Sequence, residues 1–494
     1  MVCNLRPKTN PLFVRRKRWL CFLVCVLVVP GWSGRALAEG DSLALIHVTV
    51  IDATGSAPQA DRTVVITGNR IASVSTAPPP GSARKIDARG KFLIPGLCDM
   101  HVHIAGVTAD PKWSKTTLLP LLIANGITTV RDMGGDLAAL ESWRKDINAG
   151  NLIGPRLYFP GPMLDGGKSE PPALLAVSTP NEGRAAVRDL KAKGADFIKV
   201  LSRLDRESYC AIADESKKQG MSLVGHVPNV LHAREVSEAG QKSIEHIFYS
   251  NLAFDCSARE DELREKAAEA RVKHDSAGAA AARDEANASF SREKADALAR
   301  TMVHHKTWLV PTLVAIRDIA QQRAAAGSNP PELAYVPAAL RKKWSSAEIE
   351  KDVSPEVARW YQEQFENDLK LARVLHEDGV QMLAGSDSLD PLNFPGPSLH
   401  DELVLLTEAG FTPLQALQAA TLRAAEFLNA AGAGGWGTIQ QGRAADLVLL
   451  DANPLADIRN TRKIHAVVVA GKYLDRDALD QLLAQARAAA DKAE

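Results

Sequence analysis

The sequence predicts an α/β fold in which a (β/α)8 TIM barrel is joined to a small β-sandwich domain built from both chain ends. Two observations predict it. Strand-like and helix-like segments alternate through the centre of the chain, which is typical of parallel βαβ units. Short segments rich in Val, Ile and Thr lie on either side of this centre, which indicates that one small sheet domain is assembled from the two ends.

The two β-rich ends are short strands with tight turns between them. In the N-terminal part, Gly68-Asn69 marks one such turn, and Gly471-Lys472 marks another near the far end. The expected strands are Ala44–Ile51, Arg62–Thr67, Arg70–Val74, Asp446–Leu450 and Ile464–Val469. The tail from Leu479 is charged and rich in Ala, and is interpreted as a helix or a frayed end.

Eight strand-like segments are expected in the centre, and eight parallel strands with intervening helices close naturally into a barrel. They are Leu97–His103, Thr128–Arg131, Arg156–Pro160, Phe197–Leu201, Ser222–His226, Ser243–Ile247, Leu309–Thr312 and Gln381–Asp387. Segments such as Arg184–Lys193 and Ser208–Gln219 provide the separating helices.

Two connections are much longer than usual, at about 250–307 and 314–376. Both are rich in Ala, Glu, Lys and Arg, which predicts helical insertions after strands six and seven. Both follow the carboxyl ends of strands, so a lid over the site is one interpretation, and surface helices or an interface is the other. The expected domains begin with a signal peptide at residues 1–38. The β-sandwich has its first part at 39–94 and its second at 431–475, on either side of the barrel at 95–430, and a tail follows at 476–494.

The first 38 residues have the pattern of a secretory signal peptide. Arg15–Arg18 are basic, Leu20–Val29 are apolar, and Ala36–Ala38 supply small residues at the cleavage position. The apolar run is about half of the ~20 residues that a membrane-spanning helix needs. We therefore expect a periplasmic or secreted protein with no membrane association after cleavage; an uncleaved anchor is the alternative.

Basic and acidic residues balance at 59 each, which gives a formal net charge of +0. Such a chain lacks the basic excess typical of proteins that bind nucleic acid. The expected partner is a small-molecule substrate, and the sequence leaves assembly into a homo-oligomer open.

A pair of histidines closes the first expected barrel strand. His101 and His103 are two residues apart, so the alternation of a strand places both imidazoles on one face, where they can share a metal. Pro95-Gly96 breaks the chain just before this strand. Two histidines can be so spaced by chance, and the pair alone is weak evidence.

Four further metal-capable residues close later expected strands: Lys199, His226, His246 and Asp387. Lys199 interrupts an apolar run, where a buried ammonium is costly. Each of these residues alone is more often structural: a hydrogen-bonded histidine or a paired lysine. Together they lie at the ends of strands four, five, six and eight, and in a barrel all those ends meet on one rim with the first. This coincidence predicts a metal site.

Three substrate-binding candidates are less specific. Arg131 ends the second expected strand and could hold a substrate carboxylate, or it could pair with Asp132 or another acid. Tyr249, just past strand six, could face the substrate or simply pack. His400 follows strand eight and could line the pocket, cap a helix or lie on the surface.

Several segments resemble the amidohydrolase superfamily, and more narrowly its imidazolonepropionase-like and Xaa-Pro-dipeptidase-like members. The likeness extends over essentially the whole chain after residue 38. The segments that carry it are Pro95-Gly96-Leu97-Cys98-Asp99-Met100-His101-Val102-His103, Gly225-His226-Val227-Pro228, Ser243-Ile244-Glu245-His246 and Gly442-Arg443-Ala444-Ala445-Asp446-Leu447-Val448, with Lys199 in strand four.

The resemblance implies a site for two divalent metal ions, usually zinc. His101, His103 and Asp387 would bind the more buried ion, and His226 and His246 the other. Lys199 would react with CO₂ and bridge both ions as a carbamate. Manganese, cobalt and iron also suit these ligands.

The implied reaction is hydrolysis of a C–N bond in a small amide, dipeptide or cyclic amide by a metal-bridging hydroxide. Asp387 would be the catalytic general base and then acid. Two alternatives stay open: an esterase, lactonase or organophosphate hydrolase using the same site, and a catalytically silent binding protein on the same scaffold.

Overall fold

A computed structural model describes residues 42–106, 110–322, 324–325, 328–345, 353–389, 392–430, 432 and 434–493. The signal peptide expected at residues 1–38 lies outside this range. Among the described residues, no helix combines the length and the apolar character needed to cross a membrane.

Both ends of the chain build one sheet, as the sequence predicts. Its strands are β1 Ser42–Val50, β2 Gln59–Thr67, β3 Arg70–Ser75, β4 Arg84–Asp87, β5 Phe92–Pro95, β15 Leu447–Leu450, β16 Ile464–Val469 and β17 Lys472–Leu474. They follow the order β17-β16-β15-β5-β1-β2-β3, with β4 also paired to β1. The N-terminal and C-terminal strands meet where β5 pairs antiparallel with β15.

The strands expected to form a β-sandwich lie in one continuous hydrogen-bonded sheet, and many of its buried apolar side chains share one core. The reason is the length of β1, which pairs along Leu43–Ile46 with β4 and at Thr49 and Val50 with β5. A register shift beyond Leu45, where His47 has a φ of 61°, bends this strand. One bent strand thus joins what would otherwise be two layers.

Side chains of β15 alternate between two cores because successive residues of a strand point to opposite faces. Leu447 and Leu449 pack in the core of this sheet, whereas Val448 and Leu450 pack in the main core of the molecule. Both faces are buried, which explains the unbroken apolar run in this strand. The sheet is therefore packed against the rest of the protein over a buried apolar surface.

Two parallel sheets form the centre of the molecule. One contains β6 Leu97–Val102, β7 Ile127–Asp132 and β8 Arg156–Tyr158, in that order. The other contains β9 Met163–Asp165, β10 Leu174–Ala176, β11 Phe197–Val200, β12 Ser222–Gly225, β13 Ser243–Glu245 and β14 Trp308–Val310. The order of this second sheet is β10-β9-β11-β12-β13-β14. The short strands β9 and β10 were not predicted.

The eighth predicted strand, Gln381–Asp387, is not a regular strand. It makes isolated parallel bridges from Met382 to Leu309 and from Ser388 to Val102. Asp387 interrupts the extended backbone because its φ is 54°, in the left-handed region. The segment nevertheless lies between β14 and β6, and so connects the two parallel sheets.

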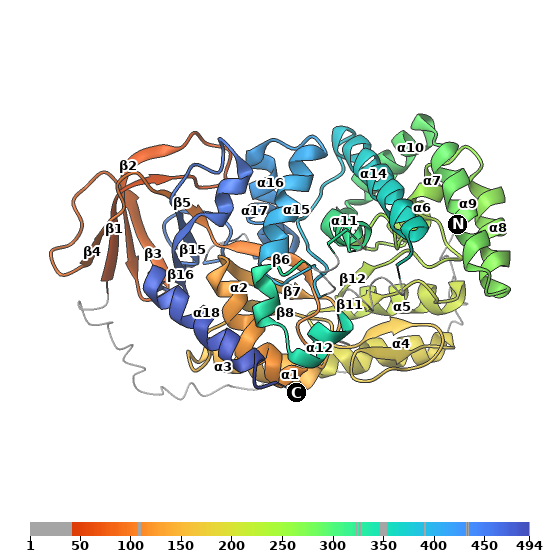
Figure 1. The fold of residues 1–494 in the computed structure, drawn as a ribbon, viewed down its shortest axis with the longest axis horizontal. Helices are drawn as coiled ribbons and strands as arrows, with labels where there is room; N and C mark the ends of the chain where they lie inside the picture. The colour runs from red at the N-terminus through yellow and green to blue at the C-terminus, as the bar shows by residue number, and fades with distance from the viewer. Residues whose placement is uncertain are drawn as a thin grey trace, which may run out of the picture.

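The two predicted insertions are helical, and Figure 1 shows α8 to α10 at the opposite end of the molecule from β1 to β4. The first insertion contains α7 Leu252–Asp255, α8 Glu260–Val272, α9 Ser276–Ala288 and α10 Arg292–His305. The second contains α11 Leu313–Gln321, η2 Pro331–Tyr335, α12 Ala338–Lys343 and α14 Pro355–Glu377. Trp360 Nε1 of α14 donates to Asp284 Oδ1 of α9, so the two insertions contact each other.

The remaining helices include some that pack against the parallel strands. They are α1 Pro111–Trp113, η1 Ser114–Leu118, α2 Leu119–Ala124, α3 Leu137–Asn148, α4 Pro180–Ala192, α5 Arg206–Gln219, α6 Ala233–Glu238, α15 Pro397–Glu408, α16 Pro413–Ala419, α17 Leu422–Phe427, η3 Ile458–Arg462 and α18 Arg476–Ala490. Of these, α2, α3, α4 and α5 pack against the parallel strands β7, β8, β11 and β12, respectively. Helix α18 contains most of the tail from Leu479, for which the sequence predicts either a helix or a frayed end. It packs against η1, where Thr117 Oγ1 donates to Ala486 O.

Candidate functional site

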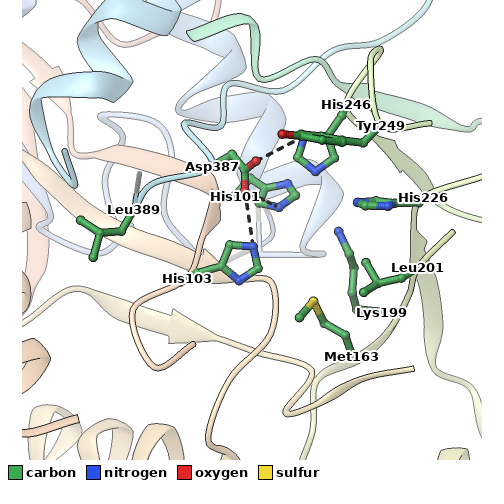
Figure 2. A pocket seen from close by; sticks show the side chains of 10 residues that line it. All are labelled: His101, His103, Met163, Lys199, Leu201, His226, His246, Tyr249, Asp387 and Leu389. Carbon is green, nitrogen blue, oxygen red and sulfur yellow. Dashed lines mark ion pairs between the residues drawn. The ribbon is translucent and has the colours of Figure 1, made fainter. Parts of the chain in front are cut away.

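All six predicted metal ligands line a single cavity of about 280 Å³. Figure 2 shows their side chains around it. The residues that line it are His101, His103, Lys199, His226, His246 and Asp387, with Met163, Leu201, Tyr249 and Leu389 beside them.

The six residues converge because each lies at the carboxyl end of a parallel strand or just beyond it. His101 and Lys199 are in the last part of β6 and β11, and His226 and His246 directly follow β12 and β13. Asp387 belongs to the segment between β14 and β6, where its N–H donates to His101 O. Parallel strands place these ends on one side of the protein.

Partners on Nδ1 orient the first two imidazoles. His101 Nδ1 lies 2.9 Å from Glu245 Oε2, and His103 Nδ1 lies 3.2 Å from Gly134 O. Both partners are acceptors, so they assign the proton to Nδ1 and leave a lone pair on Nε2. The two Nε2 atoms lie 3.3 and 3.4 Å from Asp387 Oδ1, and thus point at the same carboxylate oxygen.

The other two imidazoles are held by hydroxyl groups. Ser202 Oγ lies 2.8 Å from His226 Nδ1, and Thr312 Oγ1 lies 2.7 Å from His246 Nδ1. The Thr312 hydroxyl donates to Pro311 O, so it accepts from His246 Nδ1–H and leaves the lone pair on Nε2. The ring centroids of His226 and His246 are 5.0 Å apart.

A buried carboxylate that sequence reasoning missed supports His101. Glu245 is fully buried, and its two oxygens accept from Arg131 Nη2 at 2.9 and 2.8 Å. Ser243, two residues earlier on the same face of β13, also donates to it. A charged residue inside a buried strand was the available signal, as it was for Lys199.

A second missed carboxylate ties β6 to the segment that carries Asp387. Asp99 accepts from His101 N at 3.1 Å, and from the backbone N and the hydroxyl of Ser386 at 2.9 and 2.6 Å. Burial raises the pKa of Asp99 to about 7, although these hydrogen bonds favour its charged form. Asp99 therefore fixes the relative position of His101 and Asp387.

Two nitrogen atoms at the cavity are buried without a hydrogen bond among the described residues: Lys199 Nζ, and His101 Nε2, which faces Asp387 Oδ1 at 3.3 Å. Lys199 is 1% exposed, and burial lowers its pKa to about 8 even though Glu245 and Asp387 oppose this shift. Buried polar groups without partners are costly and normally rare. These atoms therefore indicate that the cavity binds an ion or a ligand.

The protonation of the imidazoles suits cation binding. Burial lowers the pKa values of His101, His226 and His246 well below the usual histidine value, which keeps these rings neutral. Burial would also lower the pKa of His103, but the hydrogen bond to Asp387 raises it.

Four imidazoles, a carboxylate and an amine form a donor set that suits a divalent transition metal. Ligand atoms of His101, His246 and Asp387 all lie within 4.8 Å of one another. The residues present thus fit a metal ion.

Two of the three predicted substrate-binding residues lie away from the cavity. Arg131 is fully buried and paired with Glu245, which corrects the expectation that it holds a substrate carboxylate. His400 is also fully buried, between Thr461 Oγ1 at 2.9 Å and Asn125 O at 3.1 Å, so it has a structural role. Tyr249 lines the cavity, with its ring centroid 6.2 Å from that of His226.

Comparison with known proteins places the chain in one family and identifies proteins similar to it. The model of the amidohydrolase family matches residues 92–474. An ochratoxinase from Aspergillus niger is 22% identical over 433 residues, which cover 77% of this chain and 74% of that protein. An enamidase from Eubacterium barkeri is 27% identical over 172 residues, 34% of this chain and 37% of that one.

Solved structures share the fold. A bottromycin amidohydrolase superposes with a TM-score of 0.68 at 24% identity, covering 93% of this chain and 94% of that one. A Xaa-Pro dipeptidase with methionine in its active site gives 0.65 at 22% identity, covering 88% of this chain and all (100%) of the other.

Replacing Glu245 should destabilise the whole protein. Glu245→Gln keeps the shape of the side chain but leaves the Arg131 cation buried without its counter-charge, a loss of about 3–5 kcal/mol. Urea unfolding measures this change. Glu265→Gln, at an exposed position in the middle of α8, is the control and should change stability by less than about 0.5 kcal/mol. Equal stability of the two variants would contradict the role assigned to Glu245.

Proposed function

The chain belongs to the amidohydrolase family, and on this premise we propose that its cavity is a two-metal centre that hydrolyses a C–N bond in a small amide, peptide or cyclic amide. One observation carries the proposal. Lys199 Nζ is buried without a hydrogen bond, and the lone pair of His101 Nε2 faces Asp387 Oδ1 at 3.3 Å, in a cavity that also contains three more imidazoles. A cation bound here would lie between the lone pairs of His101 Nε2 and Asp387 Oδ1, and a carbamate on Lys199 would offer oxygen atoms to cations in place of the ammonium.

The ligands divide into two groups. We assign His101, His103 and Asp387 to one ion, because Asp387 Oδ1 lies 3.3 and 3.4 Å from the two Nε2 atoms. His226 and His246 are assigned to the other ion. Zinc suits this combination of imidazole and carboxylate best.

Lys199 is assigned as the bridge between the two groups, in the form of a carbamate. A neutral amine is the form that reacts with CO₂, and a pKa of about 8 makes this form far more abundant at neutral pH than in an ordinary lysine. The product is an anion with two hard oxygen atoms. It would replace a buried ammonium, which repels cations, by a group that binds them.

The chemistry then divides between the metal ions and the protein. Divalent cations bound here acidify a water molecule and polarise a carbonyl oxygen. Asp387, whose side chain is 15% exposed toward the cavity, accepts a proton at its carboxylate and donates it to the nitrogen of the departing amine. Glu245 and Thr312 hold His101 and His246 in the required tautomers throughout.

We also infer that the two parallel sheets close into the (β/α)8 barrel. Several contacts support closure. Met100 N donates to Ala384 O and Leu383 N to Leu309 O, both at 2.9 Å, on one side, and Asp196 N donates to Phe159 O at 2.8 Å on the other. A closed barrel explains why ligands separated widely in sequence share one cavity.

Activity should depend on metal and extend over C–N substrates. We expect purified protein to hydrolyse members of a panel of N-acyl amino acid amides, dipeptides and cyclic amides, and to lose activity after chelation. Added Zn²⁺ should restore it. Aryl esters and lactones serve as the comparison, and a protein that cleaves only these, or one indifferent to the chelator, would contradict the proposal.

Asp387→Asn should lower kcat by about 10²–10⁴-fold, the usual contribution of a general acid-base group. The amide keeps an oxygen for the metal but cannot accept and return a proton. Steady-state kinetics and metal analysis of the same sample separate the two effects. Full turnover in a variant that has lost metal would refute both assignments to Asp387.

A further inference from the structure

The cavity wall beside the proposed ligands is apolar. Met163, Leu201 and Leu389 line it with Tyr249, as Figure 2 shows. Met163 and Leu389 are both largely buried, and both belong to the lining of the cavity. These residues form a surface that a substrate group would contact while its scissile bond lies at the ligands.

Tyr249 contacts two of the candidate ligands, His226 and His246. Its ring is parallel to the imidazole of His226, with centroids 6.2 Å apart, and edge-on to that of His246, with centroids 5.1 Å apart. A substrate held between these histidines would therefore lie against the phenol ring.

The first helical insertion holds the loop that carries Tyr249. Arg283 of α9 donates from Nη2 to Phe248 O at 2.7 Å and to Asn251 Oδ1 at 2.6 Å. Its guanidinium carbon lies 4.1 Å from the centroid of the Phe248 ring, a cation–π distance. Arg283 thus holds the backbone carbonyl of the residue before Tyr249 and the side chain of the residue two positions after it.

The second helical insertion holds the same loop from another side. Trp360 and Tyr361 of α14 contact the Phe248 ring, with centroid distances of 5.8 and 5.9 Å. Trp360 also donates a hydrogen bond to Asp284, the neighbour of Arg283 on α9. Phe248 is therefore enclosed by side chains from both insertions.

Charge in the cavity points to a neutral substrate. Among the described residues that line the cavity there is no arginine, and Lys199 is the sole lysine. Arg131 is already paired with Glu245. A carboxylate on the substrate that entered the apolar part of this cavity would lose its hydration without gaining a cationic partner.

We propose that the two insertions hold Tyr249 as one wall of an apolar subsite, and that the enzyme selects neutral amides with a bulky apolar group next to the scissile C–N bond. Arg283 is the positioning residue for this wall. The inference rests on the proposed function and assigns its substrate class.

The test compares the N-acetyl amides of phenylalanine, alanine and aspartate as substrates of the zinc-loaded enzyme. The wild type should favour the phenylalanine compound over the alanine compound by at least about tenfold in kcat/KM, because burying an aromatic side chain is worth that much. The aspartate compound should be the poorest substrate.

Substitutions of Tyr249 and Arg283 locate the preference. Tyr249→Ala should lose most of it through a higher KM for the phenylalanine compound, with kcat changed less, whereas Tyr249→Phe should keep it. Arg283→Met should raise the same KM, and Arg271→Met on the neighbouring helix α8 is the matched control. Metal content should be equal in all four variants, and thermal unfolding checks that Arg283→Met remains folded.

The outcomes are distinguishable. Hydrolysis of all three amides at similar rates, or an unchanged preference in Tyr249→Ala, would overturn the subsite alone. An Arg283→Met variant that is folded and retains the wild-type KM would refute the role of the insertion. Absence of hydrolysis over the whole panel would overturn the proposed function and this inference together.

Discussion

The carboxylate of Glu245 lies between a guanidinium and an imidazole, in a place that water does not reach. It accepts two hydrogen bonds from Arg131 of β7 and lies 2.9 Å from His101 of β6, while its own strand β13 leads directly into His246. Such a group is stable only when both partners remain in place, because an unpaired buried charge costs several kcal/mol. This constraint locks three strands to one another and fixes two candidate ligands at the same time. The geometry of the cavity follows from it, together with the similar role of Asp99 between His101 and Ser386.

The sequence predicted much of this arrangement because strand ends and metal-capable residues can be recognised locally. His101, His103, Lys199, His226, His246 and Asp387 were all expected at one rim, and all six line one cavity. Seven of the eight predicted barrel strands match observed strands to within a few residues. The exception is Gln381–Asp387, in which Asp387 has a backbone φ in the left-handed region. No local sequence pattern predicts this conformation for an aspartate.

The predicted substrate-binding roles that the structure does not support belong to side chains whose hydrogen-bond partners are distant in sequence. Arg131 and His400 are polar residues near strand ends, as the ligands are, but they bond to Glu245 and to Thr461, residues that only the folded chain brings near. Burial alone does not separate the two classes, because His101, Lys199 and His246 are buried as Arg131 and His400 are. Hydrogen bonding separates them. The nitrogen atoms of Arg131 and His400 have hydrogen-bond partners, whereas Lys199 Nζ and His101 Nε2 have none among the described residues. The enclosure of Phe248 by two insertions was likewise beyond sequence reasoning, because sequence does not orient such helices.

We propose that the cavity around Lys199 Nζ and His101 Nε2 binds two cations. Anomalous X-ray diffraction from crystals of the purified protein, collected at the absorption edge of the bound metal, tests it directly. We expect two peaks in the cavity, one beside His101, His103 and Asp387 and one beside His226 and His246, with a carbamate on Lys199 between them. A single peak, or an unmodified Lys199 pointing away from the histidines, would contradict it.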